Sequence, residues 1–324
     1  MKFALLLLST LPLLAIDGVV MNATTGKPQA GVAINLVQPS QNGMVPLGET
    51  KSDAQGQFKI DKTIPPGPGL LQATYQGTTY NQIITPGMPT TGIQVKIYDG
   101  TTDPIVALPA EHLILMEPSD TQIKINETFV FNNQTIRTFN DPAKGSAQIY
   151  LPPAAVGKAR AIITAPGGMP IPRTPTKASG GFYKIDYPIK PGETRMDVSY
   201  TVPAAQKFSG KVVPAPAGIH LVTPFSVTLT GDGIESQGQE PQTQAHIYNV
   251  KGATYDVTID GTGALRAETS AAGNGPAAAS GEESGSPKIE ITSARIYSKL
   301  YWVLGLAFGI LAAGATMLFR RGTA

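Results

Sequence analysis

The chain has 324 residues, of which 41% are hydrophobic and only 15% are charged. Lysine and arginine total 25 against 23 acidic residues, so the net charge is +2 and neither a basic stripe nor an acidic tail is present. Nucleic acid is therefore not an expected partner. The lack of cysteine excludes disulfides, thiolate metal sites and cysteine nucleophiles. The 35 glycines and 28 prolines favour short strands joined by many turns.

The first predicted element is a secretory signal peptide over residues 1–15. Lys2 supplies a basic start, an apolar run follows, and Ala15 is a small residue at a suitable cleavage point. The run is too short to span a hydrocarbon core of about 30 Å. We expect cleavage after Ala15, and a retained N-terminal anchor is the alternative.

From residue 16 to residue 260, apolar and polar residues alternate in short runs, which is typical of half-buried strands. Glycine and proline clusters separate the runs. The apolar positions of the clearest runs are Val32, Ile34, Leu36, Ile93, Val95, Ile97, Ile123, Ile125, Phe129, Phe131, Met196, Val198, Tyr200, Val202, Phe225, Val227, Leu229, Tyr255, Val257 and Ile259. The predicted fold class is mainly β, with tandem antiparallel β-sandwich domains and one C-terminal transmembrane helix.

Turn-rich segments divide this β region. One boundary is expected at residues 99–104 and a second at 203–207. The predicted domains are therefore a first sandwich over residues 16–98, a second over 105–203, and residues 207–261, which form either a third module or a continuation of the second. The spacing of the strands does not decide between these two arrangements.

The first module carries short motifs in the segments 18–20, 25–28, 31–36, 50 and 52–58, which read GVV, TGKP, GVAINL, T and SDAQGQF. Together these motifs resemble the carboxypeptidase regulatory-like domain, a transthyretin-like β-sandwich. The resemblance covers residues 16–98 and implies a non-catalytic accessory module that aids folding, adhesion, or contact with a partner or a carbohydrate. A zinc carboxypeptidase would also need a His-x-x-Glu pair, and none of the three histidines is followed by glutamate at that spacing.

The segment that follows this module points to the same kind of protein. Residues 98–104, leading to residues 112–115, are similar to the junction in uncharacterised bacterial membrane-anchored proteins that join such a module to further β domains. The resemblance implies a bacterial source, with the folded region in the periplasm or outside the cell.

Residues 262–288 differ in kind, because glycine, alanine, serine, proline and glutamate dominate and large apolar side chains are nearly absent. Such a segment cannot bury enough surface to offset the entropy of ordering. We interpret it as a flexible linker between the folded part and the membrane.

The segment Leu300–Phe319 is an uncharged stretch of 20 residues, which matches the thickness of a bilayer when it is helical. Residues expected to anchor it at the two interfaces are Tyr297, Tyr301, Trp302, Arg320 and Arg321. A glycolipid-attachment signal would also end in a hydrophobic tail, but the terminal arginines favour a permanent anchor. With an exported N-terminus, this segment leaves residues 16–299 outside the cytoplasm and a stub, residues 320–324, inside.

Three small residues in this segment, Gly305, Gly309 and Ala313, are spaced four apart and share one helical face. Small residues at this spacing let two membrane helices approach closely. The pattern predicts a homodimer formed through the transmembrane helix.

Candidate chemistry in the β region is sparse. Glu111, His112 and Glu117 would suit a metal or an acid–base pair, but adjacent strand residues point to opposite faces, so Glu111 and His112 are not expected to converge. Two further acidic pairs would suit calcium, although such pairs more often form turns; they are Asp99 with Asp103, and Asp232 with Glu235. Residues 281–285 do not match a serine nucleophile elbow. No catalytic, metal or cofactor residue is therefore predicted.

We expect a membrane-anchored extracytoplasmic binding or scaffolding protein that contacts another envelope protein through its β modules. The first alternative is a module that binds polysaccharide or cell-wall material, with exposed aromatic rings stacking on sugar faces. Its candidate platforms are Tyr75, Tyr80, Tyr183 and Tyr187. The second alternative is an envelope enzyme with an unrecognised site.

Overall fold

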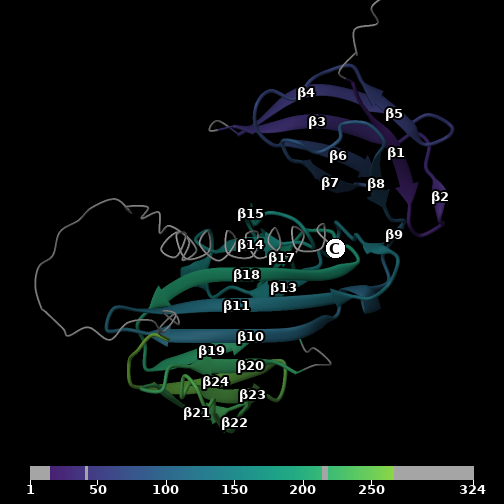
Figure 1. The fold of residues 1–324 in the computed structure, drawn as a ribbon. Coiled ribbons are helices and arrows are strands. Elements are labelled where there is room, and N and C mark those ends of the chain that lie inside the picture. The colour runs from purple at the N-terminus through teal and green to yellow at the C-terminus, as the bar shows by residue number, and fades with distance from the viewer. Residues whose placement is uncertain (1–14, 41–42, 214–217, 266–324) are drawn as a thin grey trace, which may run out of the picture. The chain divides into compact units, whose positions relative to one another are not determined.

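The computed structural model describes residues 15–40, 43–213 and 218–265, which belong to one compact unit of the chain (Figure 1). Strands dominate these ranges, so the prediction of a mainly β chain is confirmed. The helical elements in the described part are two 3₁₀ turns, η1 (Pro104–Ala107) and η2 (Pro153–Ala155).

The first core lies between two four-stranded sheets. One sheet consists of β2 (Lys27–Pro28), β1 (Ile16–Asn22), β5 (Gln57–Ile60) and β8 (Ile93–Ile97). The other consists of β4 (Gly43–Lys51), β3 (Ala33–Ser40), β6 (Gly69–Tyr75) and β7 (Thr78–Ile84). Inward residues of both sheets, such as Ile34 and Val95, form one buried cluster, because alternate side chains of a strand point to the same face.

Turn chemistry positions the strands of this first core. Gly56 has a φ of +73°, a backbone conformation that glycine adopts without strain, and a Cβ atom there would lie 2.7 Å from Pro28 Cβ. The turn reverses the chain into β5 and directs Phe58 into the core, where its side chain is buried. The short motif around Gly56 therefore has a structural role, which is to form the turn before β5.

The second region is built on an eight-stranded sheet. In spatial order its strands are β15 (Ile171–Arg173), β14 (Arg160–Thr164), β18 (Gly192–Pro203), β11 (Gln122–Asn133), β10 (Pro109–Pro118), β20 (His220–Thr223), β23 (His246–Val250) and β22 (Ile234–Gln239). The long strands β10, β11 and β18 form its centre, as Figure 1 shows.

Two three-stranded sheets contribute to the same core. One contains β13 (Ala147–Tyr150), β17 (Phe182–Ile185) and β16 (Thr176–Lys177), and the other contains β19 (Lys207–Lys211), β24 (Thr254–Asp260) and β21 (Thr228–Asp232). Residues from all three sheets, among them Ile125, Ile149 and Val257, belong to one buried cluster. The eight-stranded sheet and this core both continue across the boundary expected at residues 203–207.

The sheets are not wholly antiparallel, which differs from the expectation. β8 pairs with β1 in parallel, and β10 pairs with β20 in parallel. Parallel neighbours need long connections, and these are supplied by the chain between β1 and β8 and between β10 and β20. Alternation within a strand carries no information about the direction of a partner so distant in the sequence.

Phe225 was expected in a strand and lies in a turn instead. The backbone N–H of Val227 donates to the carbonyl oxygen of Pro224 at 2.9 Å, so β21 begins only at Thr228. Phe225 is 64% exposed as a consequence.

A small junction joins the two cores. β9 (Gly100–Thr101) pairs in parallel with β12 (Thr138–Phe139), and Phe139 also forms a bridge with Ile189. The hydroxyl of Tyr80 on β7 donates to the carbonyl oxygen of Tyr98 at 2.9 Å. Because that bond uses the only hydrogen of the Tyr80 hydroxyl, the hydroxyl of Thr138, 2.9 Å away, donates to the Tyr80 oxygen. This second bond joins the first core to the second.

Candidate functional site

The structure separates the residues that the sequence placed together around His112. Glu111 is exposed and His112 is buried, as expected for neighbours on one strand. Glu117 lies 3.3 Å from Lys124 Nζ and accepts from the backbone N–H of Leu265 at 2.9 Å. None of these contacts joins the three candidate residues.

His112 has a partner that sequence reasoning missed. Its Nε2 lies 3.2 Å from Glu127 Oε2, and both side chains are buried. The register explains the pair, because His112 is opposite Phe129 and Ile114 is opposite Glu127, which makes the two polar residues diagonal neighbours on one face. Glu127 lies between Ile125 and Phe129 at a position where the alternating pattern of β11 calls for an apolar residue. This polar residue at an inward position is the sequence signal that could have identified the pair.

The hydroxyl of Tyr200 and the ring of Phe129 complete this buried group. Tyr200 donates to Glu127 Oε1 at 2.9 Å, and the imidazole of His112 stacks on Phe129 with ring centroids 4.1 Å apart. Burial, followed by the charge of Glu127, raises the pKa of Tyr200 and of Tyr255 far above the ordinary value, so both remain protonated. The carboxylate thus has donors on both oxygens, which suits a structural role in the core.

A hollow of about 240 Å³ is lined by His112 and Ser146, among other residues. The hydroxyl of Ser146 donates to the backbone carbonyl oxygen of Tyr187 at 2.6 Å and is also 3.2 Å from that of Ile185. The serine is therefore held by backbone groups, while the imidazole is held by Glu127. This arrangement does not assemble a nucleophile with its base.

Three of the four acidic residues that suggested calcium contact other groups of the protein. Asp99 accepts from Asn22 Nδ2 at 2.7 Å, and Asp103 caps η1 by accepting from the N–H of Ile105 at 3.1 Å. Glu235 lies 3.5 Å from Lys251 Nζ. Among the described residues, no group of three or more histidine, aspartate and glutamate side chains is placed to hold a metal ion.

The four tyrosines proposed as sugar platforms do not have fully exposed rings. Tyr80 and Tyr187 are buried, and Tyr75 and Tyr183 are partly buried. Tyr75 donates to Asp99 Oδ1 at 3.2 Å. Each ring therefore presents little free face to a sugar.

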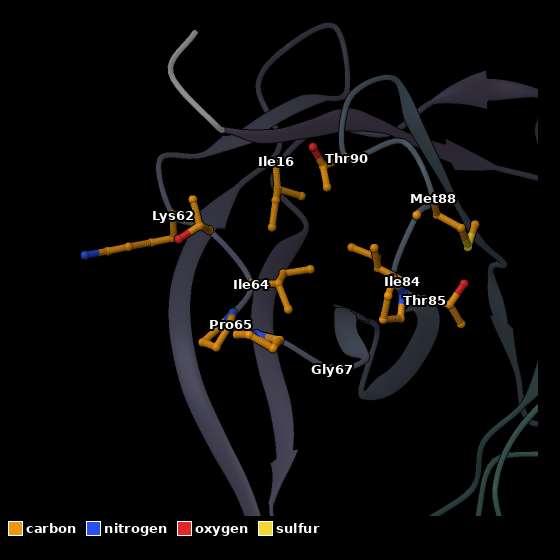
Figure 2. A pocket seen from close by; sticks show the side chains of 13 residues that line it. Ile16, Lys62, Ile64, Pro65, Gly67, Ile84, Thr85, Met88 and Thr90 are labelled. Atoms are coloured by element: carbon orange, nitrogen blue, oxygen red, sulfur yellow. The ribbon is translucent and has the colours of Figure 1, made fainter. Parts of the chain in front are cut away.

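One end of the first sandwich is hollowed, and Figure 2 shows the side chains around this end pocket. Ile16, Ile64 and Ile84 point into it, whereas Lys62 extends away from it. The volume is about 230 Å³ and the wall is formed by two proline-containing loops. The end pocket is therefore an apolar recess without a converging charge.

A larger hollow, the junction cavity, has a volume of about 490 Å³ and receives residues from both cores. Its lining consists of Met44, Leu70, Gln72, Tyr80, Asn81, Ile83, Lys96, Tyr98, Ala165, Pro166, Gly167, Gly168, Met169, Pro170, Ile171, Pro172, Tyr187, Lys190 and Pro191. Apolar and aromatic side chains predominate, with two lysines and two amides among them. This composition and volume are typical of sites that bind small molecules.

Lys190 is the most unusual residue of the junction cavity. The bridge between Ile189 and Phe139 holds its backbone, and its Nζ donates to the carbonyl oxygen of Thr79 at 2.5 Å. The ammonium also lies 5.2 Å from the ring centroid of Tyr80. Burial lowers the pKa of Lys190 to about 8.

The predicted membrane residues lie outside the described ranges. They are Tyr297, Tyr301, Trp302, Gly305, Gly309, Ala313, Arg320 and Arg321; residues 1–14 of the predicted signal peptide, which extends to Ala15, and most of the predicted linker lie outside them too. Within the described ranges, no helix has the length and apolar character needed to cross a membrane.

No family model matches the chain, and no curated protein matches its sequence. Among solved structures, the M1 zinc metallopeptidase of Deinococcus radiodurans is 8% identical, with 46% of this chain and 41% of that chain covered and a TM-score of 0.24. A mutant of the shaft pilin SpaA of Lactobacillus rhamnosus GG is 9% identical over 68% and 90% of the two chains, with a TM-score of 0.22. The major pilin subunit BcpA of Bacillus cereus is 12% identical over 76% and 68%, with a TM-score of 0.19. The matched region spans about two fifths of the metallopeptidase's length.

Proposed function

We propose that this protein is a membrane-anchored, extracytoplasmic binding or scaffolding protein without catalytic activity, and that it holds its partner at the junction cavity. The observation that carries the proposal is the cavity itself, which is bounded by two β cores and lined by tyrosines, prolines and lysines. The signal peptide and the transmembrane segment predicted from the sequence support the location. The first module, which resembles an accessory domain, supports a role in contact rather than reaction.

The buried histidine and glutamate and the partly buried serine that could take part in acid–base or nucleophilic chemistry are engaged in the second core. The carboxylate of Glu127 is bonded by His112 and Tyr200 in the core, and the Ser146 hydroxyl is bonded to backbone carbonyl groups. The junction cavity itself is lined by neither histidine nor carboxylate. A binding role is therefore favoured over acid–base or nucleophilic catalysis.

Site-specific photocrosslinking in intact cells tests this function. A photoreactive residue at position 169, where Met169 lines the cavity and is 53% exposed, should trap an envelope component. The matched control is position 156, because Val156 is 45% exposed and does not line the cavity. The expected adduct forms at position 169 alone, and protease added to spheroplasts digests it. Equal adducts at both positions, or none at either, would contradict the proposal.

A second candidate, binding of polysaccharide, is favoured by a polar row on the outer face of the β4-β3-β6-β7 sheet. Glu49, Asn35, Gln72 and Asn81 are successive cross-strand neighbours, and Gln72 Nε2 lies 3.4 Å from Asn81 Oδ1. Planar amides and carboxylates are suitable partners for sugar hydroxyls. Retention of the purified chain on isolated cell-wall material would favour this candidate.

A further inference from the structure

We propose that the junction cavity binds a small organic anion with an apolar body, whose charged group lies against Lys190 and Lys96. This inference rests on the proposed function, because it names the ligand class of the same site. It follows from the charge of the lining, from the bonding of Lys190 and from the shape and composition of the walls.

The charged side chains that line the junction cavity are all positive. Lys96 and Lys190 are the ionisable residues other than tyrosine in the lining, and no aspartate or glutamate is among the residues that form it. Arg173 adds a third cation nearby, with its guanidinium carbon 5.9 Å from the ring centroid of Tyr187. A cavity with positive groups and low-dielectric walls attracts anions.

Lys190 lacks a counter-ion within the described residues. No ion pair formed there includes this lysine, which is partly buried, and its ammonium, which has three N–H donors, contacts the carbonyl oxygen of Thr79 and the ring of Tyr80 but no anionic group. A charge removed from water is unfavourable unless an opposite charge or further hydrogen bonds compensate it. An anionic ligand would supply both, because carboxylate oxygens accept strong bonds from ammonium groups.

The walls fit an apolar body attached to that anion. Tyr80, Tyr98 and Tyr187 contribute aromatic surface, and residues 165–172, which form the loop after β14 and the start of β15, contribute prolines and Met169. The volume of about 490 Å³ lies within the range of small-molecule sites, whereas the end pocket at about 230 Å³ lies below it. A two-ring aromatic carboxylate has the size and the polarity that this lining requires.

Calorimetric titration with 1-naphthoate and its neutral analogue 1-naphthamide tests the inference on the full chain in detergent micelles. Naphthoate should bind the wild-type chain at least tenfold more tightly than naphthamide. Lys190→Met should weaken naphthoate binding about tenfold and leave naphthamide binding unchanged. Lys96→Gln, a change at the exposed lysine of the lining, should weaken naphthoate binding in the same direction and provides a second variant if the first does not fold.

Lys62→Met is the matched control, because it is the same lysine-to-methionine substitution at a residue that does not line the junction cavity. Lys62 belongs to the end pocket, and its side chain extends away from that pocket (Figure 2). This variant should bind naphthoate as the wild type does, and uptake of the probe by micelles is common to all variants. Equal affinities for naphthoate and naphthamide, or unchanged naphthoate binding in Lys190→Met, would overturn anion recognition. Absence of any naphthoate binding beyond micelle uptake would overturn it too. The crosslinking at position 169 would still test the proposed function independently.

Discussion

At the scale of single residues, the carboxylate of Glu127 is the most consequential polar group in the second core. It accepts from Tyr200 at 2.9 Å and contacts His112 Nε2 at 3.2 Å, and all three side chains are buried. Glu127→Ala would leave the hydroxyl and the imidazole without their acceptor. We expect a loss of about 3 kcal/mol or more in the free energy of unfolding, measured by urea denaturation followed by circular dichroism.

Glu235→Ala is the matched control for that prediction. The side chain of Glu235 is 53% exposed and lies 3.5 Å from Lys251 Nζ, which is a surface ion pair. Its loss should change the free energy of unfolding by less than about 1 kcal/mol. Similar losses of unfolding free energy for both variants would show that the buried Glu127 stabilises the protein no more than a glutamate on the surface does.

At the scale of elements, the close packing of β1 against its neighbours explains why glycine occupies position 18. A Cβ atom there would lie 1.9 Å from the carbonyl oxygen of Ile93 on β8 and 2.9 Å from the ring of Phe58 on β5. Gly18→Ala must therefore displace a strand backbone. We expect a loss of about 3 kcal/mol in the free energy of unfolding, measured by the same denaturation experiment.

Gly252→Ala separates crowding from a general effect of replacing glycine, because no heavy atom beyond the glycine and its two chain neighbours lies within 4 Å of the place that the added methyl group would take. The free energy of unfolding should stay within about 0.5 kcal/mol of the wild-type value. If Gly18→Ala were equally mild, the parallel pairing of β1 with β8 would be looser than the structure indicates.

The sequence predicted the strands well because burial on one face imposes an alternation that is local. The inward positions Ile34 and Val257, for example, are buried as expected. The site depended instead on contacts between distant segments, such as Lys190 with Thr79 and His112 with Glu127. No local pattern encodes which strands become neighbours, so the junction cavity could not be predicted.

At the scale of the whole described region, two buried cores meet at a junction held by hydrogen bonds. Thr138, in the second region, lies 2.9 Å from the Tyr80 hydroxyl, and the hydroxyl of Thr24 donates to the carbonyl oxygen of Ile136 at 2.5 Å. Lys190 also spans this junction through its bond to Thr79. Its protonation state should therefore affect the stability of the region that contains both cores.

The pH dependence of stability tests this role of Lys190. Burial lowers its pKa from 10.5 to about 8, so between these pH values the unfolded chain holds a proton that the folded chain has released. Stability should consequently rise with pH across this window, by up to about 3 kcal/mol relative to Lys190→Met, and level off above it. Tyrosine titration affects both chains and cancels in the comparison. The measurement is the urea midpoint of both chains from about pH 7 to about pH 10.5; parallel curves would mean that Lys190 keeps an ordinary pKa, because water reaches its ammonium group.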